Sequence, residues 1–416
     1  MSALRNILIA ILTISFFTFI AFFGRLPIFR NTPIGALHRV IWIYIPNGFS
    51  AIDRLICGGR LGSRLSRTGN YLLYDKHPGI LIFFLGLVGI CYILFLPAAW
   101  PHLSLVHHIL ITILSPQPFL LTYLCARSNP QLQIDTSNHA DRMLDYPLDY
   151  VLYHPGRKCR TCKFEKPARS KHCSICKTCV ARSDHHCVWV NNCVGRGNYK
   201  YFLALLLSMG VVISYGAYLS WYVLQPMIVT ARARWRGRVR VKIPGPQSRM
   251  DHMLDVVSRF LDTLNLAIMV GGGKLAGVGL LAVLTAPLPF GLLLYHVYLI
   301  WVGTTTNESG KWDDWKEDMD DGVVFLGDLR GDRPTYTSYY RLSQDGMGVV
   351  NVPVQWPAVS KQILVRTRDG EPPRGLADHV NGIIVPNSWR RCWKLREVEN
   401  LYDLGFSDTL TEILRN

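Results

Sequence analysis

Long apolar runs dominate the pattern of hydrophobic and polar positions along the chain. Residues 6–23 carry no charged side chain, and 18 helical residues span about 27 Å, close to the ~30 Å hydrocarbon core of a bilayer. Four further runs of comparable length follow, at residues 79–99, 103–125, 201–224 and 275–302. Buried helices of a soluble protein are a poor explanation, because such helices average only about 11 residues. The pattern predicts an all-α polytopic membrane protein with about five transmembrane helices.

The runs differ in how they begin and end. Residues 21–24 offer no small-x-small cleavage site, so the first run is expected to be an uncleaved anchor rather than a signal peptide. The fourth run is expected to stop before Pro226. The fifth contains Pro287 and Pro289 and is expected to be kinked.

Charge orients these spans. The chain has 45 Lys+Arg against 29 Asp+Glu, a formal net charge of +16, yet only 18% of its residues are charged. Residues 24–78 hold eight Lys/Arg and two acids, and residues 126–200 hold 13 and six. Because positive residues favour the cytoplasm, both segments are expected to be cytosolic. An arginine-rich stretch at residues 232–242 then falls on the lumenal side, against the same rule.

These boundaries predict eight segments along the chain. They are a first transmembrane anchor (1–24), a cytosolic loop (25–78), the second and third transmembrane helices (79–125), a cytosolic cysteine-rich domain (126–200), the fourth transmembrane helix (201–224), a lumenal loop (225–274), the fifth transmembrane helix (275–302) and a cytosolic C-terminal tail (303–416).

Cysteines cluster in one short stretch of the chain. Seven of the 11 lie between Cys159 and Cys193, together with three histidines. Closely spaced Cys pairs with nearby His are the ligands of tetrahedral Zn²⁺, and disulfides are not expected in the cytosol. Two structural zinc sites use eight of these ten ligands. One Cys and one His are left over if each site is Cys₃His.

The spare thiol is expected to be Cys187, which follows two histidines and Asp184 directly. The thiolate is the reactive form of cysteine, and an adjacent histidine lowers the barrier to forming it. A carboxylate beside the histidine would fix its tautomer. The alternative is that all ten residues bind metal, but ten ligands do not divide into four-ligand sites.

Three longer motifs run through the cysteine-rich stretch: Lys166-Pro167-x-Arg169-x2-His172-Cys173, Asp184-His185-His186-Cys187-x-Trp189 and Asn192-Cys193-x-Gly195-x2-Asn198-x3-Phe202. A further motif, Thr305-Thr306-Asn307-Glu308, lies directly after the last span. Together these motifs resemble the DHHC-family protein S-acyltransferases, or palmitoyltransferases, and the last is similar to the Thr-Thr-x-Glu motif of that family.

The resemblance implies a role for each site residue. Cys187 would be the acyl-accepting nucleophile, His185 the base and Asp184 its orienter, with Thr306 contacting the Asp184 region. The ligands of the two structural zinc ions would be Cys159, Cys162, His172 and Cys179 for one, and Cys173, Cys176, His186 and Cys193 for the other.

The resemblance also implies substrates and a location. Palmitoyl-CoA would be the acyl donor, and the lipid bilayer would surround the spans. The chain looks most like the fungal endoplasmic-reticulum branch of the family, whose substrates are membrane proteins, including SNAREs, with cysteines near the cytoplasmic end of their span. This implies a multi-pass endoplasmic-reticulum membrane protein with a cytosolic catalytic domain.

Two motifs depart from the family pattern. Asn129-Pro130-Gln131 stands where the family often has Asp-Pro-Gly, and Thr409 replaces an Asn expected in the C-terminal motif. That C-terminal motif reads Asn400-x-Tyr402-Asp403-Leu404-Gly405, and its Tyr402 is expected to have a packing role.

Other functions remain open from the residues alone. A membrane-anchored zinc module that binds a partner, or a RING-type ubiquitin ligase, would use eight ligands without a spare thiol. Nucleic-acid binding is disfavoured because the basic residues are dispersed over loops. Residues 308–321, with Trp312 and Trp315, are expected to form a solvated strip beside the membrane, and the tail beyond shows low periodicity. No internal repeat is expected.

Overall fold

The computed structural model describes residues 31–127, 129–236, 249–331, 336–343, 346–353, 356–376 and 382–415, with a few isolated positions before residue 31. Nearly all of the expected anchor at residues 6–23 lies outside these residues. Within them, four helices are long and apolar enough to cross a membrane: Gly79–His102, Leu105–Ala126, Tyr199–Arg234 and Asp255–Trp301. The chain is therefore a polytopic membrane protein.

Two compact units divide the chain. One comprises residues 1–77, 93–102 and 218–280, and the other residues 78–92, 103–217 and 281–416. The second unit holds every residue predicted to act in the site.

The second and third spans follow the hydrophobic pattern closely. Helix α5 (Gly79–Ala99) covers the predicted run, and the third run is divided into α6 (Leu105–Leu114) and α7 (Gln117–Ala126). The break falls at Ser115-Pro116, where the proline lacks the backbone N–H that would continue the helix. The hydroxyl of Ser115 donates to the carbonyl of Ile111 at 2.7 Å and so supports the end of α6.

The fourth span is longer than predicted. Helix α9 runs from Tyr199 to Arg236 and keeps Pro226 inside it, so the prediction that the helix stops before this proline was wrong. One proline removes a single N–H donor, and the apolar residues on either side continue the helix. Much of the predicted lumenal loop at residues 225–274 is also helical. It contains α10 (Arg249–Gly272) and the start of a π-helical turn, η4 (Gly273–Gly277).

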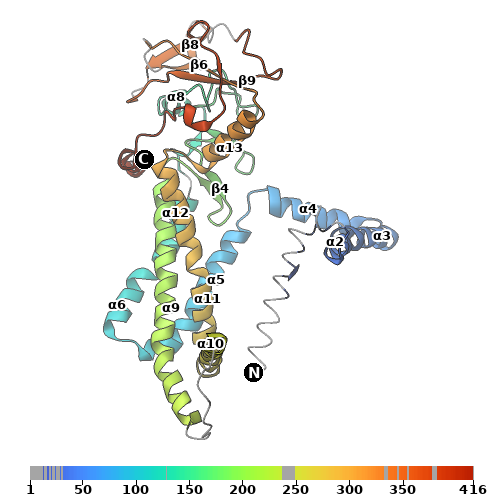
Figure 1. Cartoon of the computed structure of the whole chain (residues 1–416), viewed down its shortest axis with the longest axis vertical. Helices are drawn as coiled ribbons and strands as arrows, with labels where there is room; N and C mark the ends of the chain where they lie inside the picture. Colours follow the sequence, from blue (N-terminus) through green and yellow to red (C-terminus); the bar gives the residue numbers. More distant parts are fainter. Residues whose placement is uncertain are drawn as a thin grey trace. The chain divides into compact units, whose positions relative to one another are not determined.

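The last span leads into the site. Helix α11 (Val278–Thr285) is followed by α12 (Pro287–Trp301), with Pro287 at the first turn of α12, where a missing N–H is tolerated. Beside α12 runs the first half of α9 (Figure 1). A Cβ atom at Gly210 of α9 would lie 2.7 Å from the ring of Phe290, so this glycine permits the close approach of the two helices.

The cysteine-rich segment forms two small sheets. Their strands are β1 (Gln133–Ile134), β2 (Lys171–Cys173), β3 (Thr178–Val180), β4 (His185–Cys187) and β5 (Asn192–Val194). The first sheet has the order β1-β3-β2, the second is the hairpin β4-β5, and all pairs are antiparallel. A short helix, α8 (His139–Met143), lies between β1 and β2 in sequence.

The C-terminal tail also folds, although its sequence shows little periodicity. Its elements are α13 (Thr306–Asp320), β6 (Val324–Asp328), β7 (Tyr336–Ser343), β8 (Gly346–Pro353), β9 (Gln362–Arg366), β10 (Arg390–Arg391), η5 (Leu395–Glu397) and α15 (Phe406–Arg415). Strands β10, β6 and β9 form one antiparallel sheet, with α13 near it (Figure 1).

The start of α13 corrects the expectation of a solvated strip at residues 308–321. Glu308 is only 1% exposed, and Trp312 and Trp315 pack against a buried core that includes Leu326 and Leu364. One face of α13 is therefore buried in the protein interior, while exposed acids such as Asp313 lie on the opposite face.

Residues 33–74 of the other unit are also helical. The elements are α2 (Pro33–Arg39), a π-helical turn, η2 (Val40–Tyr44), α3 (Ile45–Cys57) and α4 (Arg60–Tyr74).

Candidate active site

Each of the two predicted zinc-ligand sets comes together in the structure. The side-chain ligand atoms within each set lie within 4.8 Å of one another. In both, the histidine Nδ1 is 3.4–3.8 Å from the three thiol sulfurs. A tetrahedral ion with Zn–S of about 2.3 Å and Zn–N of about 2.0 Å would hold sulfur and nitrogen about 3.5 Å apart.

The local backbone also fits metal-bound thiolates. In each Cys-x-x-Cys turn the backbone N–H of the second cysteine donates to the sulfur of the first, at 3.3 Å for both Cys162→Cys159 and Cys176→Cys173. Lys163 and Lys177, which follow these turns, have positive φ angles of 66° and 56°. The three thiols and one imidazole of each set are the donor set of a closed structural zinc site, so the residues present fit this ion.

The two sets are copies of one unit, contrary to the expectation of no internal repeat. In both, successive ligands are 3, 10 and 7 residues apart, and the second set lies 14 residues after the first. The strands pair in the same register: His172 opposes Cys179 in one hairpin, and His186 opposes Cys193 in the other.

Cys187 begins a third, incomplete copy of this unit. It lies 14 residues after Cys173, and Val190 and Lys200 stand where the next cysteine and the histidine would be. The sulfur of Cys187 still accepts the backbone N–H of Val190, as the first sulfur does in the two metal-binding turns. Asn191 has a positive φ of 50°, matching Lys163 and Lys177. The turn that supports metal-bound thiolates is thus retained around a thiol outside both metal sets.

His185 and Asp184 lie beside this thiol. Nδ1 of His185 is 2.6 Å from Oδ2 of Asp184, and the imidazole also interacts with the thiol of Cys187. Asp184 is 2% exposed and Cys187 is 7% exposed. Thr306 is anchored to the carboxylate, because its backbone N–H donates to Oδ1 at 2.8 Å and its hydroxyl to Oδ2 at 2.9 Å.

These contacts shift the protonation of the three groups in a consistent direction. Burial opposes the charged form of His185, but the bonds to Asp184 and Cys187 outweigh burial and raise its pKa to about 9. Burial also raises the pKa of the Cys187 thiol, yet His185 and the N–H groups of Val190 and Trp189 lower it below its usual value overall. Burial alone would raise the pKa of Asp184, but the hydrogen bond and charge of His185, the charge of His296 and the hydrogen bond from Thr306 together lower it. The arrangement favours a thiolate beside an imidazolium.

A buried ion pair between Arg169 and Glu308 lies next to the backbone that carries Thr306. Arg169, which is 0% exposed, donates from Nε to Oε1 of Glu308 at 2.8 Å and from Nη2 to Oε2 at 2.6 Å. Glu308 also accepts the N–H of Thr305 at 2.9 Å and the hydroxyl of Tyr153 at 3.0 Å. Thr305 and Glu308 form a reciprocal N-terminal cap on α13, which sets the position of Thr306. Arg169 and Glu308 each belong to a motif noted in the sequence, but neither was predicted to take part in the site.

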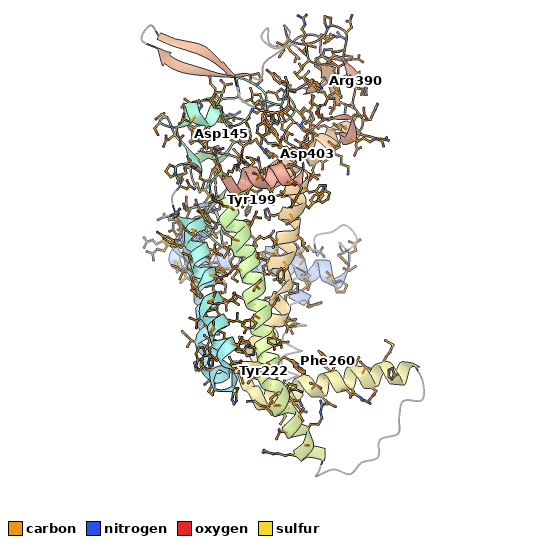
Figure 2. All side chains as sticks on the ribbon, turned by 90° about the vertical axis from the view of Figure 1, so that its left-hand side faces the viewer. Asp145, Tyr199, Tyr222, Phe260, Arg390 and Asp403 are labelled. Atoms are coloured by element: carbon orange, nitrogen blue, oxygen red, sulfur yellow. The ribbon has the colours of Figure 1, made fainter. Side chains whose placement is uncertain are left out.

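His296 is a neighbour of the site that sequence reasoning missed. It lies within α12 and is 1% exposed, and one of its ring nitrogens is within 4.8 Å of a carboxylate oxygen of Asp184 and a ring nitrogen of His185. Its Nδ1 is 2.9 Å from the hydroxyl of Tyr199. Tyr199 lies at the end of α9 that joins the cysteine-rich segment (Figure 2). The signal in the sequence was a lone histidine within an apolar span, which is an expensive residue to bury there.

A cavity of about 630 Å³ opens beside Asp184, His185 and Thr306. Basic side chains line much of the remaining wall, namely Arg157, Lys166, Lys171 and Lys311. Lys311 Nζ lies 3.8 Å from the centre of the Tyr153 ring, and burial lowers the pKa of this lysine to about 8.

The C-terminal motif closes one side of the unit. Tyr402 is 1% exposed and donates its hydroxyl to the carbonyl of Pro147 at 2.7 Å, while Asn400 donates to the carbonyl of Val302 at 2.9 Å. The ring of Tyr402 also stacks on the guanidinium of Arg169, 4.7 Å from its centre. Thr409 is buried, and its hydroxyl has no hydrogen-bond partner among the described residues.

The other divergent motif forms a tight turn. The side chain of Asn129 accepts the backbone N–H of Gln131 at 2.9 Å, and its carbonyl accepts that of Leu132 at 3.0 Å. Gly197 packs against this turn: a Cβ atom there would lie 2.5 Å from Nδ2 of Asn129.

The fold and site define a polytopic membrane protein in which a thiol beside a histidine lies on paired hairpins that could each hold a metal ion. A family model described as DHHC palmitoyltransferase matches residues 152–313. The chain is 43% identical over 421 residues to palmitoyltransferase SWF1 of Neurospora crassa, covering 99% of this chain and 92% of that protein. It is 41% identical over 429 residues to palmitoyltransferase swf1 of Emericella nidulans, covering 100% and 98% respectively. The chain therefore belongs to the DHHC palmitoyltransferase family, within its fungal branch, and is a protein S-acyltransferase.

Proposed function

We propose that Cys187 carries the palmitoyl group as a thioester between the donor and the protein substrate. The observation that carries this proposal is the chain of hydrogen bonds from Thr306 through Asp184 and His185 to Cys187. Of the seven thiols in the hairpin segment, Cys187 is the one that belongs to neither metal-binding set.

In the first step, His185 accepts the thiol proton and the Cys187 sulfur attacks the thioester carbonyl of palmitoyl-CoA. The new C–S bond forms as the bond to the CoA sulfur breaks, and CoA leaves with the proton held by His185. Asp184 keeps Nδ1 of His185 protonated, so that Nε2 faces the thiol, and it stabilises the imidazolium. Thr306 fixes Asp184 in turn.

In the second step, a cysteine of the substrate protein attacks the acyl-Cys187 thioester. His185 takes the proton of the incoming thiol, the acyl group moves to the substrate, and Cys187 is released as a thiolate. Both steps exchange one thioester for another, so the site mainly provides positioning and a ready thiolate. Zinc bound by the two Cys₃His sets would hold the hairpins that carry His185 and Cys187, as a structural ion without an open position.

The surroundings of the site fit the two ends of the donor. The phosphates of CoA are anionic and suit the cavity lined by Arg157, Lys166, Lys171 and Lys311. The acyl chain would lie among the apolar membrane helices, where each buried CH₂ contributes about 0.8 kcal/mol.

The segment boundaries and topology expected from the sequence belong to the same proposal. A first span near the N-terminus would bring the total to five. The loop at residues 25–78, the catalytic segment and the tail would face the cytosol, and the interval at residues 225–274 the lumen. The protein would reside in the endoplasmic reticulum and acylate juxtamembrane cysteines of membrane proteins such as SNAREs.

The nucleophile is tested with full-length protein and radiolabelled palmitoyl-CoA. Cys187→Ser should not acquire a hydroxylamine-sensitive label, whereas Cys125→Ala should acquire it as the wild type does. Cys125 is a matched control, because it is a buried thiol in the same apolar cluster as Cys187 and lies outside both metal sets. A hydroxylamine-sensitive label on Cys187→Ser would exclude the assignment.

The substrates are tested by acyl-biotin exchange on membranes from cells with and without the enzyme. Loss of signal should concentrate on single-span proteins with a cysteine at the cytosolic end of the span. An unchanged profile would contradict the substrate proposal while leaving the self-acylation result intact.

A further inference from the structure

Helices α3 and α4 form a fixed pair. Gly58 and Gly59 join them with positive φ angles of 60° and 79°, a turn that other residues rarely adopt. Asp53 of α3 is 5% exposed, and its carboxylate accepts the backbone N–H groups of Leu61 at 3.1 Å and Gly62 at 2.6 Å. This buried carboxylate caps the first turn of α4, so the crossing of the two helices is held by specific bonds rather than by a loose linker.

The apolar face of α3 is exposed. Ile45, Phe49, Ile52 and Ile56 follow one another at intervals of four, three and four residues, which places them on one side of the helix. Their exposed fractions are 60%, 41%, 57% and 77%. Arg54 lies on the opposite side by the same periodicity. A continuous apolar face of this kind on a folded element marks an interaction surface.

Helix α4 adds a basic stripe. Arg60, Arg64 and Arg67 recur at intervals of four and three residues, and all three are exposed. Leu61 and Leu65, also exposed, follow a neighbouring line along the same helix. Within the part of the chain that the structure describes, none of the three arginines forms an ion pair. Residues 31–78 contain six Lys/Arg and only two acids, so the segment favours an anionic partner.

The chain connection keeps this pair beside the bilayer. Helix α4 ends at Tyr74, and the membrane span begins at Gly79. Five extended residues reach at most about 18 Å, so the end of α4 cannot lie farther than that from the start of the span. This distance is comparable to the depth of the headgroup zone plus one helix diameter.

We propose that α3 and α4 lie on the membrane surface as a binding site for anionic phospholipids. The apolar face of α3 enters the boundary between headgroups and acyl chains, and Arg60, Arg64 and Arg67 bind phosphate and carboxylate groups of the lipid. An amphipathic segment with arginines on its polar side and aromatic or aliphatic residues on the other is the pattern of interfacial helices. Charge and proximity to the span favour lipid over a second protein as the partner.

The apolar arm of the test uses a photoreactive residue in the full-length protein. p-Benzoylphenylalanine replaces Phe49, a change that keeps an aromatic ring, and in a matched variant it replaces Arg54. Both proteins are placed in vesicles of phosphatidylcholine and phosphatidylserine with tritiated acyl chains and are irradiated. The proposal expects lipid label on the Phe49 variant to exceed that on the Arg54 variant about fivefold or more. Equal labelling of both, or a cross-link from position 49 to a protein band, would overturn it.

The charge arm compares lipids in the same vesicles. Labelling from position 49 is measured with either phosphatidylserine or phosphatidylcholine as the tritiated lipid, in the wild-type background and in Arg60→Gln/Arg64→Gln/Arg67→Gln. The wild-type background should prefer phosphatidylserine, and the triple variant should lose at least about fivefold of that preference. An unchanged preference would overturn the role of the arginines. Self-acylation of the variants checks folding, because these residues lie outside the active site.

Discussion

The buried pair of Arg169 and Glu308 gives a quantitative prediction for Glu308→Gln. The substitution keeps the shape of the side chain but leaves the guanidinium of Arg169, which is 0% exposed, without a counter-ion. Breaking one partner of a buried ion pair costs about 3–5 kcal/mol. In a unit of this size, 1 kcal/mol corresponds to roughly 2–4 °C, so the apparent melting temperature should fall by about 6–20 °C.

A double-mutant cycle separates this pair from its surroundings. Arg169→Met combined with Glu308→Gln removes both charges, so the double variant should be destabilised less than the sum of the single variants, with a coupling of about 1–3 kcal/mol. Glu317→Gln is a matched control, because Glu317 lies on the exposed side of the same helix and should change the melting temperature little.

Thermal unfolding of the full-length protein in detergent, followed by tryptophan fluorescence, measures both quantities. Self-acylation by palmitoyl-CoA is recorded on the same samples at a temperature where each variant is folded. A fall of less than about 2 °C for Glu308→Gln, or strictly additive effects in the cycle, would refute the argument that this pair holds the start of α13.

Four further outcomes are expected. Thr306→Val should slow self-acylation about ten- to a hundredfold by removing a hydrogen bond to an ionised carboxylate, whereas Thr306→Ser should retain most of it. Removing metal with a chelator should release about two zinc ions per chain and make the hairpins sensitive to trypsin. Asn191→Val should reduce self-acylation about tenfold, because a β-branched residue resists the φ of 50°, while Asn191→Gly should not. At pH 8 an amine-selective reagent should label Lys311, whose pKa is about 8, faster than the exposed Lys316 of the same helix, and CoA should protect it.

Each of these has a result that would count against it. Equal rates for Thr306→Val and Thr306→Ser would remove the role of the hydroxyl. A single released ion, or unchanged trypsin resistance, would contradict two structural sites. Equal activity of the two Asn191 variants would show that its backbone conformation is unimportant. Labelling of Lys311 that CoA does not slow would argue against the basic cavity as the donor site.

The sequence was informative where chemistry demands particular residues at short spacing. The zinc-ligand sets, the thiol outside them and the neighbouring carboxylate all lie within one short stretch, so their proximity could be inferred before folding. Four of the expected spans were likewise visible as apolar runs. The repeat of 14 residues was present in the same stretch of sequence but was not predicted.

The remaining features depend on contacts between distant segments. Glu308 appeared to belong to a solvated acidic strip, since its local surroundings are polar; only the tertiary pairing with Arg169, 139 residues earlier, explains its burial. In the sequence, His296 is an isolated histidine in an apolar span. Only the packing of α12 in the folded protein places it beside Asp184 and His185. The helix continuing through Pro226 shows that one lost hydrogen bond does not outweigh the propensity of the residues on either side.

The short strand β4 serves two purposes through its two faces. Successive side chains of a strand project to opposite sides, so His186 can face a metal site while His185 and Cys187 face each other on the reverse. Inserting or deleting one residue between Asp184 and His185 would exchange these sides, placing the metal ligand in the reaction site and the base in the metal site. The number of residues in this strand is therefore constrained separately from their identity.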